Sequence, residues 1–312
     1  MRRCLPPTPP LEAKKCLFSY VMSTYARGRC RKGSDKLKLL FVDVSRAYFY
    51  APARRPVYVN LPDEDYEPGM CGRLNVSMYG TQDAASNWEH KYSTHLIECG
   101  FVRGKSSPCV FWNPNTGVRC VVHGDDFTFA GTDEELDKCS KMMKEEYDVK
   151  IRGKLGPDKG DDKPITILNR CVEWGRDGIL YEPDPRHVEI VVRELGLKDS
   201  KSVVSPGVKR PQVLDEDNKH LEPALATKFR QIIARCNFLC QDRPDIVYAC
   251  KDAARGMAKP RLEDWEKLIR IGKYLKGRPR YVIKYKPQRD VYAINVYGDK
   301  EEHSWQAKWV GP

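Results

Sequence analysis

The hydrophobic and polar positions along the chain follow the period of a strand in some segments and of a helix in others. Residues 37–44 form an apolar run that contains Asp43 and predicts a buried strand. Residues 57–61 predict a short second strand in a segment interrupted by prolines. A helical period follows at residues 83–99. Its apolar face comprises Ala84, Trp88, Tyr92, Leu96 and Cys99.

The most informative pattern is a predicted β-hairpin in the middle of the chain. Apolar runs at residues 118–123 and 127–130 flank the tripeptide Gly124-Asp125-Asp126, whose composition is typical of a tight turn. The pattern therefore predicts two strands with a pair of carboxylates at the tip between them.

The remaining segments predict a mixture of helices and short strands. Thr132 and Glu135 stand at capping-box spacing and predict the start of a helix. We expect residues 153–164 to be a loop and residues 202–222 to be a linker. Helices are expected at residues 132–147, 186–195, 225–239 and 263–275, and strands at residues 165–168, 179–181, 281–285 and 291–297.

Composition limits the classes of protein to consider. With 41% hydrophobic and 31% charged residues, the chain is typical of a soluble globular protein. It has no apolar run long enough for a membrane span and no signal peptide at its start, so we expect an intracellular location. The 12 cysteines include no Cys-x-x-Cys pair, and we expect them to be reduced thiols rather than zinc ligands.

The net charge of +11 is unevenly distributed. Residues 1–40 contain ten Lys or Arg and two acidic residues, and residues 251–289 contain thirteen and four. Residues 133–148 are acidic, with seven acidic residues and three basic ones. Basic ends favour a polyanionic partner such as nucleic acid, because phosphate binding releases counterions. A solvated basic surface explains the charge equally well.

Three aspartates suggest a specific chemistry. Nucleotidyl transfer to a 3′-hydroxyl uses two divalent cations, and Mg²⁺ takes oxygen ligands. Asp43 on one strand, with Asp125 and Asp126 on a hairpin tip, would supply such ligands if the two strands are neighbours. Gly-Asp-Asp is also an ordinary turn composition. The tripeptide alone therefore does not distinguish a metal site from a plain turn.

Five ordered blocks of sequence resemble copia-type retrotransposon reverse transcriptases. They are "KLLFVDVSRAYFYAPARRPVYVNLP", "GRLNVSMYGTQDAASNWEHKYSTHLIECGFVRGKSSPCVF", "VRCVVHGDDFTFAGTDEEL", "RPDIVYA" and "KYLKG". The resemblance implies RNA-directed DNA synthesis on an RNA or DNA template–primer, with deoxynucleoside triphosphates and Mg²⁺ or Mn²⁺.

The same resemblance assigns roles to individual residues. Asp43, Asp125 and Asp126 match the metal-binding and catalytic aspartates of the family. Three more matches would belong to a nucleotide-binding site. They are Tyr48 as an aromatic gate against the 2′-hydroxyl, Gly80 in the template grip, and Lys150 as a candidate proton donor to pyrophosphate. A buried core aromatic, a turn glycine and a surface lysine are the plain alternatives for these three residues.

The resemblance also implies an architecture. We expect an α+β fold, in which an antiparallel sheet with helices on one face forms the palm. The expected regions are residues 1–36, a basic segment with incomplete fingers; 37–201, fingers and palm; 202–222, a linker; 223–280, a helical thumb or connection; and 281–312, the truncated start of a ribonuclease H domain with Asp299 in its first acidic position. We expect the chain in the cytoplasm, a virus-like particle or the nucleus. The sequence does not indicate an oligomeric state.

Some positions depart from the family pattern. His123 and Gly124 replace an aromatic and an apolar residue before the aspartate pair, and Ala85 stands where the family has proline. Residues 1–36 do not reproduce the basic fingers strands that grip the triphosphate, so we expect weak activity or none. A decayed, non-catalytic fragment that still folds and binds nucleic acid is the main alternative. A nucleotide cyclase or RNA polymerase with the same palm is disfavoured by Tyr48 and the two last blocks.

Overall fold

The computed structural model describes residues 11–25, 36–208, 218–287, 293–296 and 305–308. The chain divides into two compact units. Unit 1 consists of residues 1–165, 173–179 and 285–312, and unit 2 consists of residues 166–172 and 180–284. Antiparallel sheets and helices occur together, as the predicted α+β class requires.

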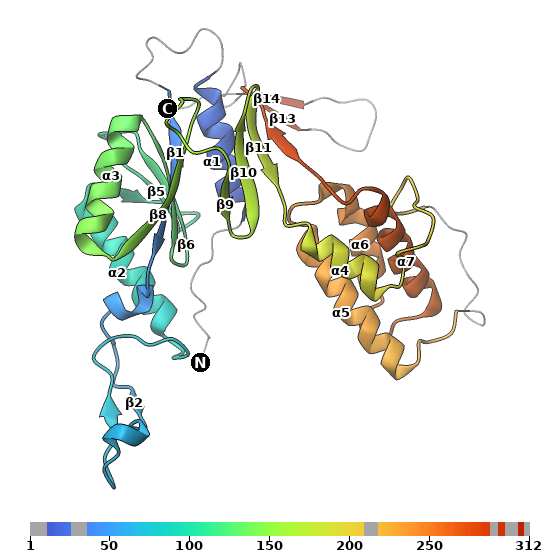
Figure 1. The fold of residues 1–312 in the computed structure, drawn as a ribbon, viewed down its shortest axis with the longest axis horizontal. Coiled ribbons are helices and arrows are strands. Elements are labelled where there is room, and N and C mark those ends of the chain that lie inside the picture. The colour runs from blue at the N-terminus through green and yellow to red at the C-terminus, as the bar shows by residue number, and fades with distance from the viewer. Residues whose placement is uncertain (1–10, 26–35, 209–217, 288–292, 297–304, 309–312) are drawn as a thin grey trace. The chain divides into compact units, whose positions relative to one another are not determined.

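Unit 1 contains a six-stranded antiparallel sheet in the order β4-β5-β6-β7-β1-β8 (Figure 1). Because β1 pairs with β7 on one side and with β8 on the other, residues far apart in the sequence become neighbours across it. The strands are β1 (Lys38–Val44), β4 (Val102–Arg103), β5 (Val110–Trp112), β6 (Arg119–His123), β7 (Asp126–Gly131) and β8 (Val149–Leu155).

The two faces of this sheet are covered by different helices (Figure 1). Alternate strand residues such as Leu40, Val42 and Phe127 point into a core beneath α2 and α3. The opposite face is covered by α1, whose Tyr20 ring lies 3.7 Å from the guanidinium of Arg119 on β6. The helices of this unit are α1 (Leu11–Ser23), α2 (Ala84–Glu98) and α3 (Asp133–Glu146), and a 3-10 turn, η2 (Ala47–Tyr50), follows β1.

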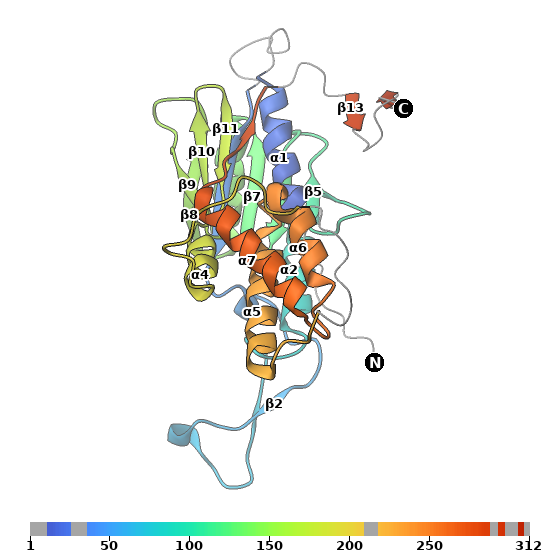
Figure 2. The ribbon, with the colours of Figure 1, turned by 90° about the vertical axis from the view of Figure 1, so that its right-hand side faces the viewer.

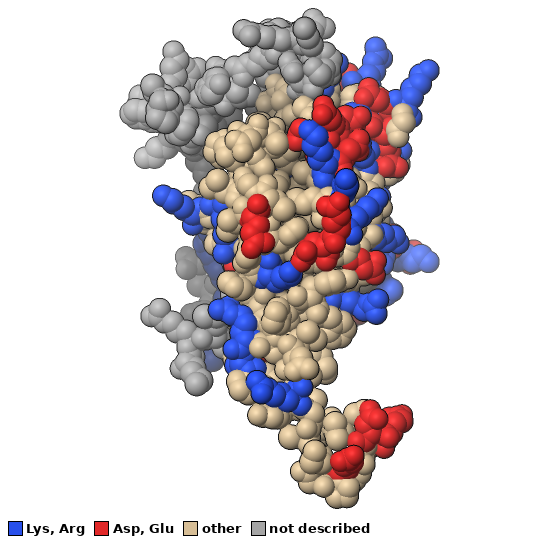
Figure 3. Space-filling model, turned by 90° about the vertical axis from the view of Figure 1, so that its left-hand side faces the viewer, with Lys and Arg blue, Asp and Glu red and all other residues tan. Residues whose placement is uncertain are grey.

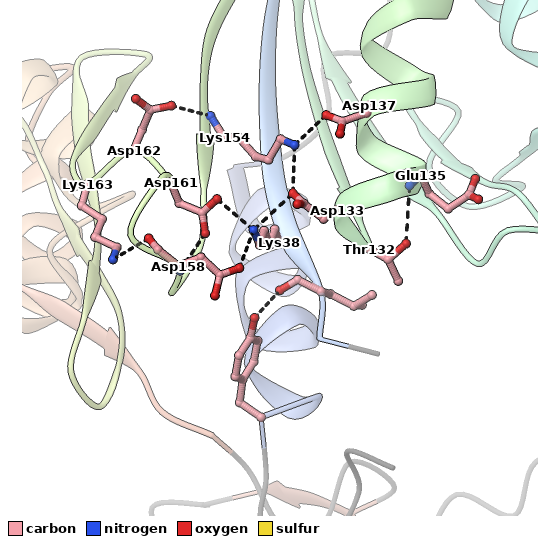
Figure 4. A network of polar contacts seen from close by, with 12 residues as sticks. Lys38, Thr132, Asp133, Glu135, Asp137, Lys154, Asp158, Asp161, Asp162 and Lys163 are labelled. Carbon is pink, nitrogen blue, oxygen red and sulfur yellow. Dashed lines mark hydrogen bonds and ion pairs between the residues drawn. The ribbon is translucent and has the colours of Figure 1, made fainter. Parts of the chain in front are cut away.

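A buried lysine fixes the beginning of β1 (Figure 4). The Lys38 side chain is only 6% exposed, and its Nζ lies 2.7 Å from Asp158, 2.9 Å from Asp161 and 3.2 Å from Asp133. These carboxylates come from the loop after β8 and from the first turn of α3. Burial alone would lower the lysine pKa, but the three hydrogen-bonded carboxylates raise it, so the ammonium remains charged.

A second lysine extends this network along the edge of the sheet. Lys154 on β8 contacts Asp133 at 2.8 Å and Asp137 at 2.6 Å (Figure 4). Gly156 lies so close to the network that an added Cβ would be 2.4 Å from an oxygen of Asp161. The start of β1, the loop after β8 and the start of α3 are therefore held together by charge.

Residues 52–76 leave this unit as an extended arm, in both views of the ribbon (Figures 1 and 2). The arm contains β2 (Tyr58–Val59) paired with β3 (Gly72–Arg73), and the 3-10 turn η3 (Asp63–Asp65) lies at its tip. No residue of this described segment is buried.

Unit 2 is mainly helical and has its own core. The helices α5 and α6 contribute Phe229, Ile233 and Ala253 to it, and α7 contributes Leu268 and Ile271. The elements are α4 (Arg186–Glu194), α5 (Pro223–Leu239), the 3-10 turn η4 (Pro244–Ile246), α6 (Val247–Ala254) and α7 (Leu262–Gly277).

The last two sequence blocks that resemble the family meet in this core. Arg243 of "RPDIVYA" is fully buried and makes two hydrogen bonds to Asp245, at 2.9 and 2.8 Å. Tyr274 of "KYLKG" donates a hydrogen bond to the same carboxylate at 2.9 Å. These residues therefore join α7 to the turn before α6 in the fold of unit 2.

The remaining strands form two smaller sheets. One has four strands in the order β12-β11-β10-β9, and the other pairs β13 with β14. The strands are β9 (Ile165–Ile167), β10 (Arg170–Gly175), β11 (Gly178–Glu182), β12 (Ile283–Tyr285), β13 (Ala293–Val296) and β14 (Trp305–Lys308).

Most of the expected elements are confirmed, including the hairpin at residues 119–131 and the helices α2, α3, α4, α5 and α7. At the start of α3, Thr132 accepts a hydrogen bond from the backbone N–H of Glu135, as the capping-box spacing predicts. The sequence did not predict α1, α6, β3, β4, β5, β10, β14 or the first four residues of β8. Residues 153–155 belong to β8 rather than to the expected loop.

The structure bears on two expectations drawn from composition. The ten cysteines that it describes are free thiols. Within the described ranges, no helix is both long and apolar enough to cross a membrane. Asp299 lies outside the described residues.

Candidate active site

The predicted aspartates lie on the face of the six-stranded sheet that is opposite the α2–α3 core. Asp43 on β1 is directly across from Asp126 on β7 and from Lys150 on β8. Residues directly opposite in an antiparallel pair point to the same face, with Cβ atoms roughly 5 Å apart. The strand order β7-β1-β8 therefore brings one basic and two acidic side chains from three segments together.

Backbone and side-chain contacts hold the tip of the hairpin beside β1. The N–H of Val44 donates to the carbonyl oxygen of Asp125 at 3.0 Å. The buried indole of Trp88 on α2 donates from Nε1 to the carbonyl oxygen of Gly124 at 2.8 Å. Gly124 has a φ of +67°, a conformation that favours glycine. Asp125 is exposed at this fixed tip.

The surroundings of Asp126 disfavour its ionised form. Asp126 is half-buried, and burial raises the pKa of its carboxyl group, as do the negative charges of Asp125 and Asp43. Lys14 on α1 and Arg152 on β8 act in the opposite direction. Asp126 thus experiences the charges of two carboxylates, which two cations partly offset.

Asp43 has a cationic partner of its own. An Arg152 Nη lies 2.9 Å from its carboxylate, and the two side chains are 43% and 21% exposed respectively. Three carboxylates offer the oxygen ligands that Mg²⁺ and Mn²⁺ bind. In the described part of the chain, however, no three His, Cys, Asp or Glu side chains are gathered as ligands of one ion. A shared cation would require the carboxylate of Asp43 to turn away from Arg152.

Aromatic rings border the site beside the hairpin tip. Tyr48, in η2, is partly buried, and its ring centroid lies 4.4 Å from that of Tyr79. Phe49 contacts the same Tyr79 ring edge-on at 5.7 Å. Burial raises the pKa of the Tyr48 hydroxyl, and the nearby Tyr79 and Asp125 raise it further. Tyr48 is therefore held near Asp125 as a neutral ring, tilted by 31° against the ring of Tyr79.

The other sequence-predicted residues take different positions. Gly80 is exposed and has a φ of +91°, with no protein atom within 4 Å of an added Cβ. Its conformation explains the glycine, and the space in front of it is open. Ala85 lies in the first turn of α2, where proline is also tolerated, so this departure from the family pattern leaves the helix unaffected.

Three residues near the site were missed by the sequence analysis. Lys14 and Arg152 are the cations near the aspartates, and Tyr79 stacks on Tyr48. Arg152 follows Lys150 by two residues and therefore shares its face of β8, a signal that was available in the sequence. The approach of Lys14 depends on how α1 packs and has no local signal.

Comparisons with known proteins find relatives among the Pol polyproteins of transposons. The chain is 25% identical over 278 residues to a retrovirus-related Pol polyprotein from transposon RE2 of Arabidopsis thaliana, covering 86% of this chain and 18% of that protein. It is 23% identical over 251 residues to the Pol polyprotein from transposon TNT 1-94 of Nicotiana tabacum, covering 76% and 18%. The chain is homologous to copia-type Pol polyproteins.

The homology concerns a limited part of those polyproteins. The matched region spans less than a fifth of the length of each of the two plant relatives. No family model matches the chain. Among solved structures, one of a foamy viral protease-reverse transcriptase in complex with an RNA/DNA hybrid matches 75% of this chain and 26% of that chain, with 12% identity and a TM-score of 0.35. The chain is thus similar to a limited region of retrotransposon Pol polyproteins.

Proposed function

We propose that the chain is the polymerase core of a retrotransposon reverse transcriptase, which extends a primer by nucleotidyl transfer. The observation that carries the proposal is the register of β7, β1 and β8, which places Asp43 opposite Asp126 and beside the hairpin tip. Homology to copia-type Pol polyproteins over most of the chain supports the same reading.

Asp43, Asp125 and Asp126 would hold Mg²⁺ or Mn²⁺. The bound ions would activate the primer 3′-oxygen and neutralise charge on the leaving pyrophosphate. Arg152 is well placed to exchange its carboxylate partner for a phosphate of the incoming nucleotide, because guanidinium groups bind both kinds of oxyanion.

The remaining roles concern the sugar, the template and the leaving group. Tyr48, held by the ring of Tyr79, would lie under the sugar and clash with a 2′-hydroxyl. Gly80 would leave room for a template backbone, because nothing fills the space where its side chain would be. Lys150, on the same face as Asp43, would donate a proton to pyrophosphate.

Primer extension on an RNA template, with deoxynucleotides and Mg²⁺ or Mn²⁺, tests the proposal. We expect slow synthesis by the unmodified chain and a further loss of about two to three orders of magnitude in rate for Asp125→Asn. The matched control is Asp199→Asn, which changes an exposed aspartate in the turn after α4 and should leave the rate unchanged. Equal rates for both variants would remove Asp125 from the catalytic set.

The ion pair between Asp43 and Arg152 favours a second candidate, a non-catalytic chain that binds nucleic acid. In that case the arginine would permanently occupy the carboxylate that a metal needs. The same assay separates the candidates: no extension with either ion, combined with intact template–primer binding, would favour the non-catalytic chain.

A further inference from the structure

The indole of Trp88 belongs both to the core of unit 1 and to the hairpin tip. Its ring is 1% exposed and makes edge-on contacts with Tyr147 and Phe127, whose ring centroids lie 5.3 and 6.3 Å away. Its Nε1–H donates to the carbonyl oxygen of Gly124 at 2.8 Å. Among side chains, only tryptophan joins so large an apolar ring to an N–H donor. Trp88 therefore connects the packed core to the tip that carries two of the three aspartates.

The surroundings of the indole favour this hydrogen bond. Charged side chains gather on the surface, as Figure 3 shows for one face of the chain, whereas Trp88 lies among apolar and aromatic residues. A buried donor without an acceptor loses its hydrogen bonds to water and gains none in return. The carbonyl oxygen of Gly124 is the acceptor that satisfies the Trp88 N–H.

The two-residue loop between β6 and β7 is held at both of its carbonyl oxygens. That of Gly124 accepts from Trp88 on α2. That of Asp125 accepts from the N–H of Val44 on β1 at 3.0 Å. The tip is thus held from two sides, by a helix and by the strand that also carries Asp43.

The conformation of the loop gives both contacts importance. Gly124 has a φ of +67°, and glycine at the first position of a two-residue hairpin loop is typical of a type II′ turn. Glycine has more backbone freedom to lose on folding than any other residue. Without the indole, the peptide between Gly124 and Asp125 can rotate more freely. Such a rotation would move the carboxylate of Asp125 relative to that of Asp43.

We propose that Trp88 is a positioning residue, which holds the hairpin tip so that the aspartate pair faces Asp43 at the separation a divalent cation needs. In this role the indole touches neither the metal nor the nucleotide, and it acts only through the carbonyl oxygen of Gly124. The inference rests on the proposed function, because it concerns the metal site of the same three carboxylates.

Replacing the N–H group of the indole tests the proposal. Benzothienylalanine carries sulfur in place of the N–H, and nonsense suppression introduces it at Trp88 of the full chain. The ring then still fills the core but donates nothing to the hairpin. Amide hydrogen exchange, measured by NMR, follows the N–H of Val44, whose acceptor is the carbonyl oxygen of Asp125. We expect its protection to fall about fivefold, while that of Phe129, further along β7, remains unchanged.

Metal affinity provides a second measurement. We expect the dissociation constant for Mn²⁺, followed by electron paramagnetic resonance, to rise about fivefold in the same variant, because a loosened tip adopts the binding conformation less often. Trp88→Phe should weaken Mn²⁺ binding in the same way. It should also lower the stability of the fold, because the smaller ring leaves a cavity. The matched control is benzothienylalanine at Trp112, which is 46% exposed on β5 of the same sheet and should change neither exchange nor affinity.

Three outcomes would overturn the proposal. They are unchanged protection of Val44, a loss of protection that Phe129 shares, and an Mn²⁺ affinity that survives the loss of the N–H. Trp88 would then act only as a core residue. Failure of the proposed function is a different result, in which the unmodified chain extends no primer although the exchange of Val44 still responds to the replacement.

Discussion

At the scale of single residues, the candidate site is a balance between three carboxylates and the cations around them. Lys14 is buried on α1, and Arg152 reaches across from β8 to Asp43. The three aspartates were singled out through the resemblance of the surrounding sequence blocks to the family, because a strand-end Asp and a Gly-Asp-Asp turn are each weak signals alone. The sequence could not predict their cationic partners, since contact with them depends on the strand order β7-β1-β8 and on the packing of α1.

Replacing Arg152 with glutamine should increase the affinity of the site for divalent cations. The substitution releases the carboxylate of Asp43 and removes a positive charge from its neighbourhood. A partly exposed ion pair contributes up to about 1 kcal/mol, so we expect a gain of roughly threefold to fivefold. Titration of the chain with Mn²⁺, followed by electron paramagnetic resonance, measures it.

The control for this titration is Arg46→Gln. Arg46 is an exposed residue that follows β1, and its guanidinium lies 3.9 Å from the carboxylate of Asp148. Its loss should leave Mn²⁺ affinity nearly unchanged. Equal gains in both variants would mean that overall charge, rather than the pair with Asp43, limits metal binding.

Asp126→Asn should stabilise the fold at neutral pH, although it removes a proposed metal ligand. The pKa of Asp126 is raised by burial and by two neighbouring carboxylates, so its ionised form opposes folding. For a raised carboxyl pKa, stability is greatest below the unfolded-state value and declines as the pH rises through the folded-state value. The advantage of asparagine should therefore appear above the folded-state pKa and vanish in acid.

Urea unfolding of both chains at pH 7 and pH 3 measures this difference. Asp125→Asn is the matched control, because Asp125 is exposed at the hairpin tip and pays little for burial. A loss of stability for Asp126→Asn at pH 7 would show that attraction to Lys14 and Arg152 outweighs burial.

At the scale of the elements, prediction succeeded where one pattern dominated a segment. The face of α2 that carries Trp88 and Leu96 repeats at helical spacing, and those residues are buried. Prediction failed at β8, where Gly153 and three basic side chains resemble a loop. A register shift in the pairing with β1 puts Val149 and Ile151 on one face of the sheet and Leu155 on the other, so the strand lacks a continuous alternation. The strand forms there because β1 offers an unpaired edge, which is a tertiary effect that local composition does not reveal.

Lys38→Met should destabilise unit 1 substantially. The substitution leaves the buried carboxylate of Asp161, only 7% exposed, without its cation and near Asp158 and Asp133. Removing one partner of a buried ion pair costs about 3 kcal/mol or more. Urea unfolding at neutral pH, followed by tryptophan fluorescence, measures the change in the free energy of unfolding.

Lys154→Met provides the comparison within the same network. The partners of Lys154, Asp133 and Asp137, have side chains that are 57% and 67% exposed. Water can therefore solvate them after the substitution, and we expect a cost of about 1 kcal/mol or less. Equal costs for the two lysines would contradict the view that burial makes Lys38 special.

At the scale of the whole molecule, the basic residues and the candidate site favour ligands of opposite charge. The aspartates attract cations, whereas the basic residues at positions 251–289 favour a polyanion. A chain that extends a primer needs both the metal-binding aspartates and the basic surface. A chain that only binds nucleic acid needs the basic surface alone. Binding and catalysis should therefore respond to different substitutions.

Template–primer binding should weaken strongly with salt, whether or not the chain is catalytic. If basic side chains contact six or more phosphates, the dissociation constant should rise roughly a thousandfold between about 50 and 200 mM salt. Fluorescence anisotropy with a labelled RNA/DNA primer–template measures this slope. Asp125→Asn should leave the slope unchanged, because it alters a proposed metal ligand and no phosphate contact.

Basic residues of unit 2 should account for part of the slope. Lys251 on α6 and Lys259 after it are both exposed. The double substitution Lys251→Gln with Lys259→Gln should lower the slope of log dissociation constant against log salt concentration by about 1 for each phosphate contact that is lost. Lys105→Gln, at an exposed loop of unit 1, serves as the control. A flat response to salt in the unmodified chain would show that its +11 charge is a solvated surface. Nucleic-acid binding would then have to be abandoned together with both functions proposed for this chain, since each depends on it.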